Sequence, residues 1–437
     1  MNCWKAIYAA IALTVISGGI SASGVAAAQT TAITGGKIII GDGSDPIENG
    51  TVLLRGGKVV SAGANVTVPA GANRIDASGK WVTPGIFAGF SRVGLIEITG
   101  VTSTNDASAS GSKFNAGLDI APAIDPFRSP IAVNRAAGVT RAVVAPGPSR
   151  DVFAGQGAIA DLGADDDPVT QRRAFQFVQF GAAGAGRAGG SRAANHLEFK
   201  AMLREARDYA NGRGGFDDQL LRAEDAQALL RVLRGQVRLL AHVEGANDIL
   251  RLLELKREYP AIKLVLVGAT EGWRVASRIA AARVPVIASA LNDLPADFDQ
   301  LAATQSNIGR MKAAGVNVAI GMINDNDAHQ LRYTTQYAGN LVALKKLPGA
   351  KGLSWNEAFA AISSKPAQIM GLDDRLGSLR PGRAADVVIW DGDPLELSST
   401  PVRVLIDGVE QPLTNRHTKL RERYRNPVPA QLPKAYD

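Results

Sequence analysis

The alternation of strand-like and helix-like segments through the middle of this chain limits its fold more than any other feature. Short apolar runs rich in Val, Ile and Leu are separated by amphipathic stretches, which is typical of βα units and a parallel sheet. Eight such strands predict an α/β fold with a (β/α)₈ TIM-like barrel, and a doubly wound open sheet is the alternative. The candidate strands lie near Ile86 and over residues 140–145, 158–162, 174–180, 237–242, 262–267, 284–288 and 316–320.

Helical periodicity follows several of these candidate strands. The clearest helix covers 246–258, in which apolar and charged residues fall on opposite faces. Shorter helices are predicted over 274–282 and 299–314. Two segments, 99–115 and 181–194, are rich in small residues and are predicted to be loops.

Short apolar runs split by Gly-Gly and Asp-Gly turns occur at both ends of the chain, over 37–60 and again over 385–408. This pattern predicts β-hairpins. Exposed strand edges are a liability unless they pair, so we expect the two pieces to form one discontinuous β-sandwich domain. The predicted domains are therefore a composite β domain from 29–80 plus 376–413, an intervening barrel over 81–375, and a C-terminal tail over 414–437.

The first 28 residues have the pattern of a secretory signal peptide. A lysine precedes an apolar run, and the small residues Ala26 and Ala28 stand at the −3 and −1 positions before Gln29. An uncleaved anchor helix is the alternative, although the run is short for a span of about 20 residues. The single cysteine, Cys3, lies in this segment, so the mature chain has no disulfide. We expect a periplasmic or secreted bacterial protein with no transmembrane segment after cleavage.

The charge pattern bears on the partners of this protein. The chain has 48 Lys and Arg against 41 Asp and Glu, a formal net charge of +7, and the basic residues are scattered. No basic patch interleaved with aromatic residues occurs, so a nucleic-acid partner is not expected. A small-molecule ligand or substrate is expected instead, and the sequence leaves homo- and hetero-oligomers open.

Motifs in both terminal pieces resemble those of a known enzyme family. The N-terminal piece contains G-T-V from Gly50, V-P-A-G-A from Val68 and I-D-A from Ile75, and the C-terminal piece contains R-L-G-S-L from Arg375 and D-G-D-P from Asp391. Together they resemble the amidohydrolase superfamily, in particular its imidazolonepropionase-like metal-dependent hydrolases, over nearly the whole mature chain. The resemblance implies hydrolysis of carbon–nitrogen bonds, in non-peptide or dipeptide-like compounds, with zinc or another divalent cation at the barrel mouth.

Most metal-ligand positions implied by the resemblance carry other residue types here. Aligned from Pro84 with the first-strand pattern P-G-[LFI]-[IV]-D-x-H-x-H, Phe90 and Arg92 take the two His positions. A phenyl ring has no donor atom for a metal, and a guanidinium has no acceptor. The fourth strand, near 174–180, has no Lys or Glu. Only His242, at the end of the fifth strand, matches a family ligand, and its alternative role is that of a hydrogen-bonded histidine at the mouth.

Three further polar residues are candidates for the mouth of the barrel. Glu271 follows the sixth strand, and Asp325 and His329 follow the eighth. With His242 they could form a substitute metal site, or they could be a solvated polar rim. If no metal is bound, Arg92 would take the place of the cation and hold Asp325, Glu271 or an anionic ligand.

Two functions follow from these substitutions. The first is an exported amidohydrolase-type hydrolase that works through a reduced or altered site. The second is a catalytically inactive pseudoenzyme that keeps the barrel as a binding or partner module. The sequence does not decide whether the protein is an enzyme. No cofactor is assigned, and we expect no stoichiometric zinc at the usual binuclear position, because a catalytic zinc needs about three protein ligands.

Overall fold

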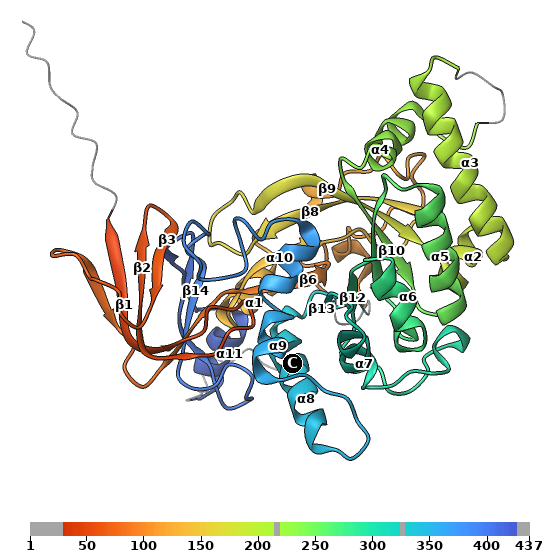
Figure 1. Ribbon diagram of the computed structural model, residues 1–437. Helices are drawn as coiled ribbons and strands as arrows, with labels where there is room; N and C mark the ends of the chain where they lie inside the picture. The colour runs from red at the N-terminus through yellow and green to blue at the C-terminus, as the bar shows by residue number, and fades with distance from the viewer. Residues whose placement is uncertain (1–28, 214–218, 324–327, 426–437) are drawn as a thin grey trace, which may run out of the picture.

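The computed structural model describes residues 29–213, 219–323 and 328–425. The predicted signal peptide, the end of the predicted tail and the candidate Asp325 lie outside the described residues. The described chain forms two eight-stranded sheets, which lie side by side in Figure 1 with the sheet of the chain ends on the left. In the described residues, no helix has the length and apolar character needed to cross a membrane.

Strands from both ends of the chain make the first sheet. Its order is β16-β15-β14-β5-β1-β2-β3, with β4 paired to β1, and Val387 of β14 lies opposite Pro84 of β5. Hydrogen bonds connect all of these strands into one sheet, where a sandwich of two sheets was expected, and the sheet has an apolar cluster of its own. The strands are β1 Thr30–Ile38, β2 Ile47–Arg55, β3 Lys58–Gly63, β4 Asn73–Asp76, β5 Trp81–Pro84, β14 Val387–Trp390, β15 Pro401–Ile406 and β16 Val409–Glu410.

The second sheet is barrel-like and nearly closed. Its order is β13-β12-β11-β10-β9-β8-β7-β6, and the amide of Met322, just after β13, donates a 3.0 Å hydrogen bond to the carbonyl of Phe90 in β6. Each of the eight predicted strands overlaps one strand of this sheet. They are β6 Ile86–Ser91, β7 Val139–Val144, β8 Phe153–Asp161, β9 Val169–Gln179, β10 Arg238–Val243, β11 Lys263–Gly268, β12 Val286–Ala288 and β13 Val318–Ile320.

One strand departs from a regular (β/α)₈ barrel. Strand β8 is antiparallel to both β7 and β9, and the other neighbours are parallel. The connections on either side of β8 are only residues 145–152 and 162–168. A parallel crossover needs about a dozen residues or more, so these connections return the chain directly as hairpins. The other seven strands still place their C-terminal ends at the same end of the barrel.

Helices pack around the barrel, and two of them lie where a loop was predicted. The segment 181–194 holds α2 and the start of α3, because its alanines favour helix and Ser191 caps α3 by accepting from the amide of Ala193 at 3.2 Å. The long helix α3 lies at the edge of the molecule away from the first sheet (Figure 1). The helices are α1 Ser129–Ala136, α2 Gly181–Arg187, α3 Arg192–Ala210, α4 Ala223–Leu233, α5 Ala246–Glu258, α6 Ala276–Ala281, α7 Asn307–Ala313, α8 Thr334–Ala343, α9 Trp355–Ala360, α10 Ser364–Met370 and α11 Arg416–Arg425.

A buried charge cluster joins the barrel to the first sheet. Arg141 of β7 donates from Nε to Asp386 at 2.7 Å and from Nη2 to Asp407 at 2.7 Å, and its Nη1 lies 3.5 Å from Asp161. Burial raises the pKa of Asp161 to about 6. Three carboxylates around one guanidinium therefore hold the two sheets in a fixed relation.

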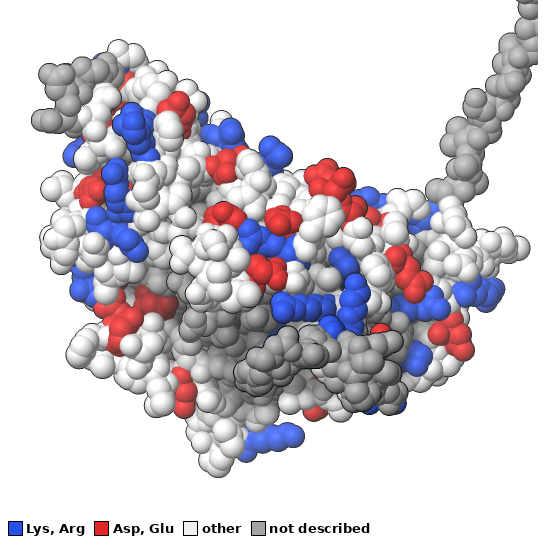
Figure 2. Space-filling view, turned by 180° about the vertical axis from the view of Figure 1, so that it is seen from behind, with Lys and Arg blue, Asp and Glu red and all other residues white. Residues whose placement is uncertain are grey.

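Charged side chains are mixed over the face of the molecule seen in Figure 2. Lysine and arginine lie among aspartate and glutamate there and do not gather in a single broad patch. This face therefore offers no extended basic surface for a nucleic acid.

Candidate active site

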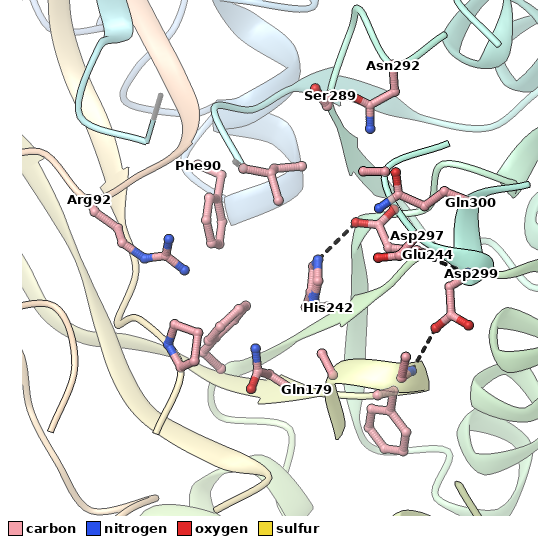
Figure 3. Close-up of a pocket in the computed structure, with 17 residues that line it drawn as sticks. Phe90, Arg92, Gln179, His242, Glu244, Ser289, Asn292, Asp297, Asp299 and Gln300 are labelled. Carbon is pink, nitrogen blue, oxygen red and sulfur yellow. Dashed lines mark hydrogen bonds and ion pairs between the residues drawn. The ribbon is translucent and has the colours of Figure 1, made fainter. Parts of the chain in front are cut away.

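A hollow of about 360 Å³ opens at the C-terminal ends of the barrel strands, and we call it the mouth pocket. Barrel enzymes place their active sites at this end. Its polar side chains come from the ends of β6, β9 and β10 and from the segment after β12 (Figure 3). They are Arg92, Gln179, His242, Glu244, Ser289, Asn292, Asp297, Asp299 and Gln300.

A histidine–glutamate pair lies at the centre of the mouth pocket. His242 and Glu244 are two residues apart at the end of β10, so strand alternation points both side chains to the same side. Nε2 of His242 lies 2.9 Å from Oε1 of Glu244 (Figure 3). A carboxylate only accepts hydrogen bonds, so Nε2 is the donor of this pair.

Residues after β11 hold the Glu244 carboxylate in place. Its Oε2 accepts from the amide of Thr270 at 3.0 Å and from the hydroxyl of Thr270 at 2.6 Å. The hydroxyl oxygen in turn accepts from Nδ2 of Asn292, a pocket residue, at 3.0 Å. Gly268 has a φ of +92°, and a Cβ there would lie 2.4 Å from Oε1 of Glu244, so only glycine fits beside this carboxylate.

A buried cation and two phenyl rings form another part of the pocket wall. Phe90 is fully buried, and its ring centroid lies 5.6 Å from that of Phe177. The guanidinium carbon of Arg92 lies 5.9 Å from the centre of the Phe90 ring. Burial lowers the pKa of Arg92 to about 10, which leaves the side chain protonated at neutral pH. Figure 3 shows Arg92 and His242 on opposite sides of Phe90.

Ion pairs hold the rim of the mouth pocket. Arg192, at the start of α3, pairs with Asp299 in the segment after β12 and with Asp248 of α5 at 3.1 Å. The carboxylate of Asp299 also accepts from the amide of Ala182 in α2 at 2.7 Å. Next to Asp299, the side chain of Phe298 is 90% exposed. The rim is therefore anchored by charge and carries an apolar side chain on its outside.

The structure brings together some of the residues that the sequence singled out. Phe90, Arg92 and His242 all line the mouth pocket. Glu271 is not among the lining residues, because its carboxylate accepts from the amides of Ala246 and Ala302 and pairs with Arg274. His329 is buried and lies 3.1 Å from the side-chain nitrogen of Gln330, also away from the lining of the pocket.

Sequence reasoning missed Glu244, Thr270 and the residues of the rim. The spacing of His242 and Glu244 at a strand end was a usable signal, since alternate residues of a strand share a face. No comparable local signal marked Thr270, Asn292 or Asp299, which come from loops.

Comparisons with known proteins agree with this geometry. Residues 205–410 match the family model described as Amidohydrolase family. The chain is 25% identical over 384 residues to an imidazolonepropionase of Mesorhizobium japonicum, an alignment that covers 80% of this chain and 88% of that protein. The chain belongs to the amidohydrolase superfamily.

Two further proteins are similar to this chain over most of its length. It is 24% identical over 378 residues to Amidohydrolase tasK of Hapsidospora irregularis, and the match spans 79% of this chain but only 38% of that longer protein. An amidohydrolase from Thermotoga maritima MSB8 superposes with a TM-score of 0.76 at 24% identity, covering 88% of this chain and 100% of the other. The superposition shows a shared fold.

At three positions of the mouth pocket where the superfamily resemblance implies metal ligands, the chain has other residue types. Phe90 and Arg92 stand where the resemblance implies two His, and Gln179 ends β9 where it implies a Lys or Glu. His242 already bonds Glu244 through Nε2. Within 29–213, 219–323 and 328–425, no three His, Cys, Asp or Glu side chains converge in a way that could hold a metal ion.

Proposed function

We propose that this protein is a hydrolase that cleaves a carbon–nitrogen bond in a small molecule bound in the mouth pocket. The observation that carries the proposal is the Glu244 carboxylate, held between His242 and Thr270 in the same hollow as the Arg92 cation. Membership of the amidohydrolase superfamily and the position at the strand C-termini support it. A hollow of about 360 Å³ suits a small ligand.

In this proposal Glu244 is the general base. A carboxylate has about four lone-pair sites, and three are used by His242 and the two donors of Thr270, which leaves one to accept a proton from water. His242 holds the carboxylate in position by donating from Nε2. The Arg92 cation favours an anionic end of the substrate, such as the carboxylate of a dipeptide-like compound.

The proposal includes a degenerate metal site and export from the cell. Phe90, Arg92 and Gln179 stand where the superfamily pattern has metal ligands, so the proposed chemistry rests on Glu244 and no step is routed through a metal. Export would follow cleavage before Gln29, and N-terminal sequencing of the periplasmic or secreted protein tests it. A mature protein that still begins at Met1 would contradict export and leave the mouth-pocket proposal unaffected.

A kinetic comparison of two glutamate variants tests the catalytic role. The mature protein is assayed against dipeptides, N-acyl amino acids and cyclic amides, and then Glu244→Gln is compared with Glu254→Gln. We expect Glu244→Gln to lower kcat by about 100-fold or more, since it removes a general base. Glu254 pairs with Arg251 on the surface of α5, so its variant should match wild type.

Two results would contradict the proposal. One is equal activity of Glu244→Gln and wild type. The other is tight ligand binding by calorimetry with no turnover by wild-type protein, with and without added divalent metal, which would instead favour a binding module.

A further inference from the structure

A second hollow, of about 460 Å³, lies at the end of the barrel opposite the mouth pocket, and we call it the basal pocket. It is formed at the first residues of β10 and β11, by the segments that lead into β12 and β13, and by α10. Since β10 to β13 run parallel, these residues are far along the strands from His242 and its neighbours. The basic side chains that line the hollow are Arg238, Lys256, Lys263 and Arg283, and the lining contains no Asp or Glu.

Within the described residues, the four cations have no counter-charge in direct contact. Among the ion pairs of the described residues, none involves Arg238, Lys256, Lys263 or Arg283. Asp373 acts on Arg238 only as a nearby charge. Burial lowers the pKa of both Arg238 and Lys256, which shows that these two cations have lost part of their hydration.

Two of the four cations have a structural role, because each donates a hydrogen bond to a backbone carbonyl near the end of a helix. Nε of Arg238 donates to the carbonyl of Ile369 near the end of α10, and Nζ of Lys256 donates to the carbonyl of Pro260 after α5. Such contacts are a common use of cations at helix C-termini. Lys263 and Arg283 are exposed at the edge of the same hollow and make no side-chain hydrogen bond within the described part of the chain, so their charges are available to a ligand.

We propose that the basal pocket binds a small soluble molecule that carries a phosphate or diphosphate group. A phosphate group carries about two negative charges and several acceptor oxygens. These oxygens can accept hydrogen bonds from more than one cation. The planar fork of an arginine suits phosphate oxygens, and a lysine adds a point charge. A single carboxylate would offset only one of the four charges. This site is separate from the mouth pocket, so it does not depend on the proposed hydrolase activity.

Calorimetric titration of the full mature protein with pyrophosphate, at constant ionic strength, tests the basal pocket. Wild type should bind with a saturable heat. The double variant Lys263→Gln/Arg283→Gln should weaken binding by about tenfold or more, because it removes two cations that make no other contact. The double variant Arg204→Gln/Arg207→Gln removes the same net charge from the exposed surface of α3 and should change the affinity by less than about twofold.

Three outcomes would overturn the proposal. The first is no saturable binding of pyrophosphate by wild type, and the second is equal weakening in both double variants, which would show unspecific attraction. The third concerns a lipid headgroup as the source of the phosphate. Binding to phosphatidylglycerol vesicles that depends on Lys263 and Arg283, without binding of soluble pyrophosphate, would assign the hollow to a membrane surface.

Discussion

Two buried arginines of the barrel differ in the direction of their pKa shift. The side chain of Arg141 is 4% exposed and lies beside Asp161, Asp386 and Asp407. Burial acts to lower its pKa, but Asp386 and Asp407 raise the pKa above its ordinary value. Arg92 is equally buried at 4%, but desolvation lowers its pKa to about 10. The first arginine joins two sheets, and the second lies in the wall of a pocket. The comparison teaches that burial of a charge does not by itself indicate its role, and that the surroundings of the charge do.

The largest expected effect is the loss of Arg141. Arg141→Ala leaves Asp161 and Asp386 buried without their cation, so we expect the free energy of unfolding to fall by about 3–5 kcal/mol. Urea unfolding at neutral pH measures this. Asp407→Asn is the matched control, because Asp407 is 54% exposed and an exposed pair contributes about 1 kcal/mol or less. Equal losses in the two variants would remove the distinction between a structural arginine and its exposed partner.

A smaller effect concerns the pH dependence of the same cluster. The raised pKa of Asp161 means that the folded state binds more protons than the unfolded state between about pH 4 and pH 6. This stabilising contribution is complete below the unfolded pKa and is lost as the pH rises through about 6. Between about pH 4 and pH 7, the stability of Asp161→Asn relative to wild type should therefore rise by about 2–3 kcal/mol.

Urea unfolding of wild type and Asp161→Asn across this pH range measures the trend. Asp374→Asn, a change at an exposed aspartate whose charge does not act on Asp161, should show a stability difference from wild type that varies much less with pH. A constant difference between Asp161→Asn and wild type would show that Asp161 titrates normally.

The smallest expected effect lies at the mouth pocket. Arg92→Met keeps much of the side-chain volume, whereas Arg141→Ala leaves a cavity as well as two buried carboxylates, so the free energy of unfolding should fall less in Arg92→Met than in Arg141→Ala. If Arg92 binds an anionic end of the substrate, KM for an anionic substrate should rise by about tenfold with little change for a neutral one. A stability loss as large as that of Arg141→Ala would mean that both arginines are structural.

The sequence predicted most of the strands because their signal is local. All eight barrel strands were expected, and the helix expected over 246–258 forms as α5 with the same bounds. These features depend on the spacing of apolar residues along a few turns or a few strand residues. The direction of β8 is fixed by the short connections on each side of it, whose lengths were in the sequence but were not used. The helix over 181–187 was missed because its small residues were interpreted as a loop.

The candidate site was only partly predictable, because local patterns identify the strand ends but not the positions of the loops. The family pattern placed Phe90, Arg92 and His242 at the mouth, and the structure puts all three in one hollow. The pattern could not place the loops, so it proposed Glu271, whose carboxylate instead accepts from the first amide of α5 and from the amide of Ala302. Glu244 was within reach of strand alternation, whereas its contact with Thr270 depends on how β11 lies beside β10.

The sequence by itself determined the periodic elements, the superfamily and the residue types at the ends of the strands. Only the tertiary structure decided which charges meet. Arg141 and Asp386 are separated by 245 positions and yet form an ion pair at 2.7 Å, and the cations of the basal pocket come from two strands, a helix and a connecting segment. The physical reason is range, because a strand or helix depends on neighbours in the chain, whereas the surroundings of a buried charge depend on packing between distant segments.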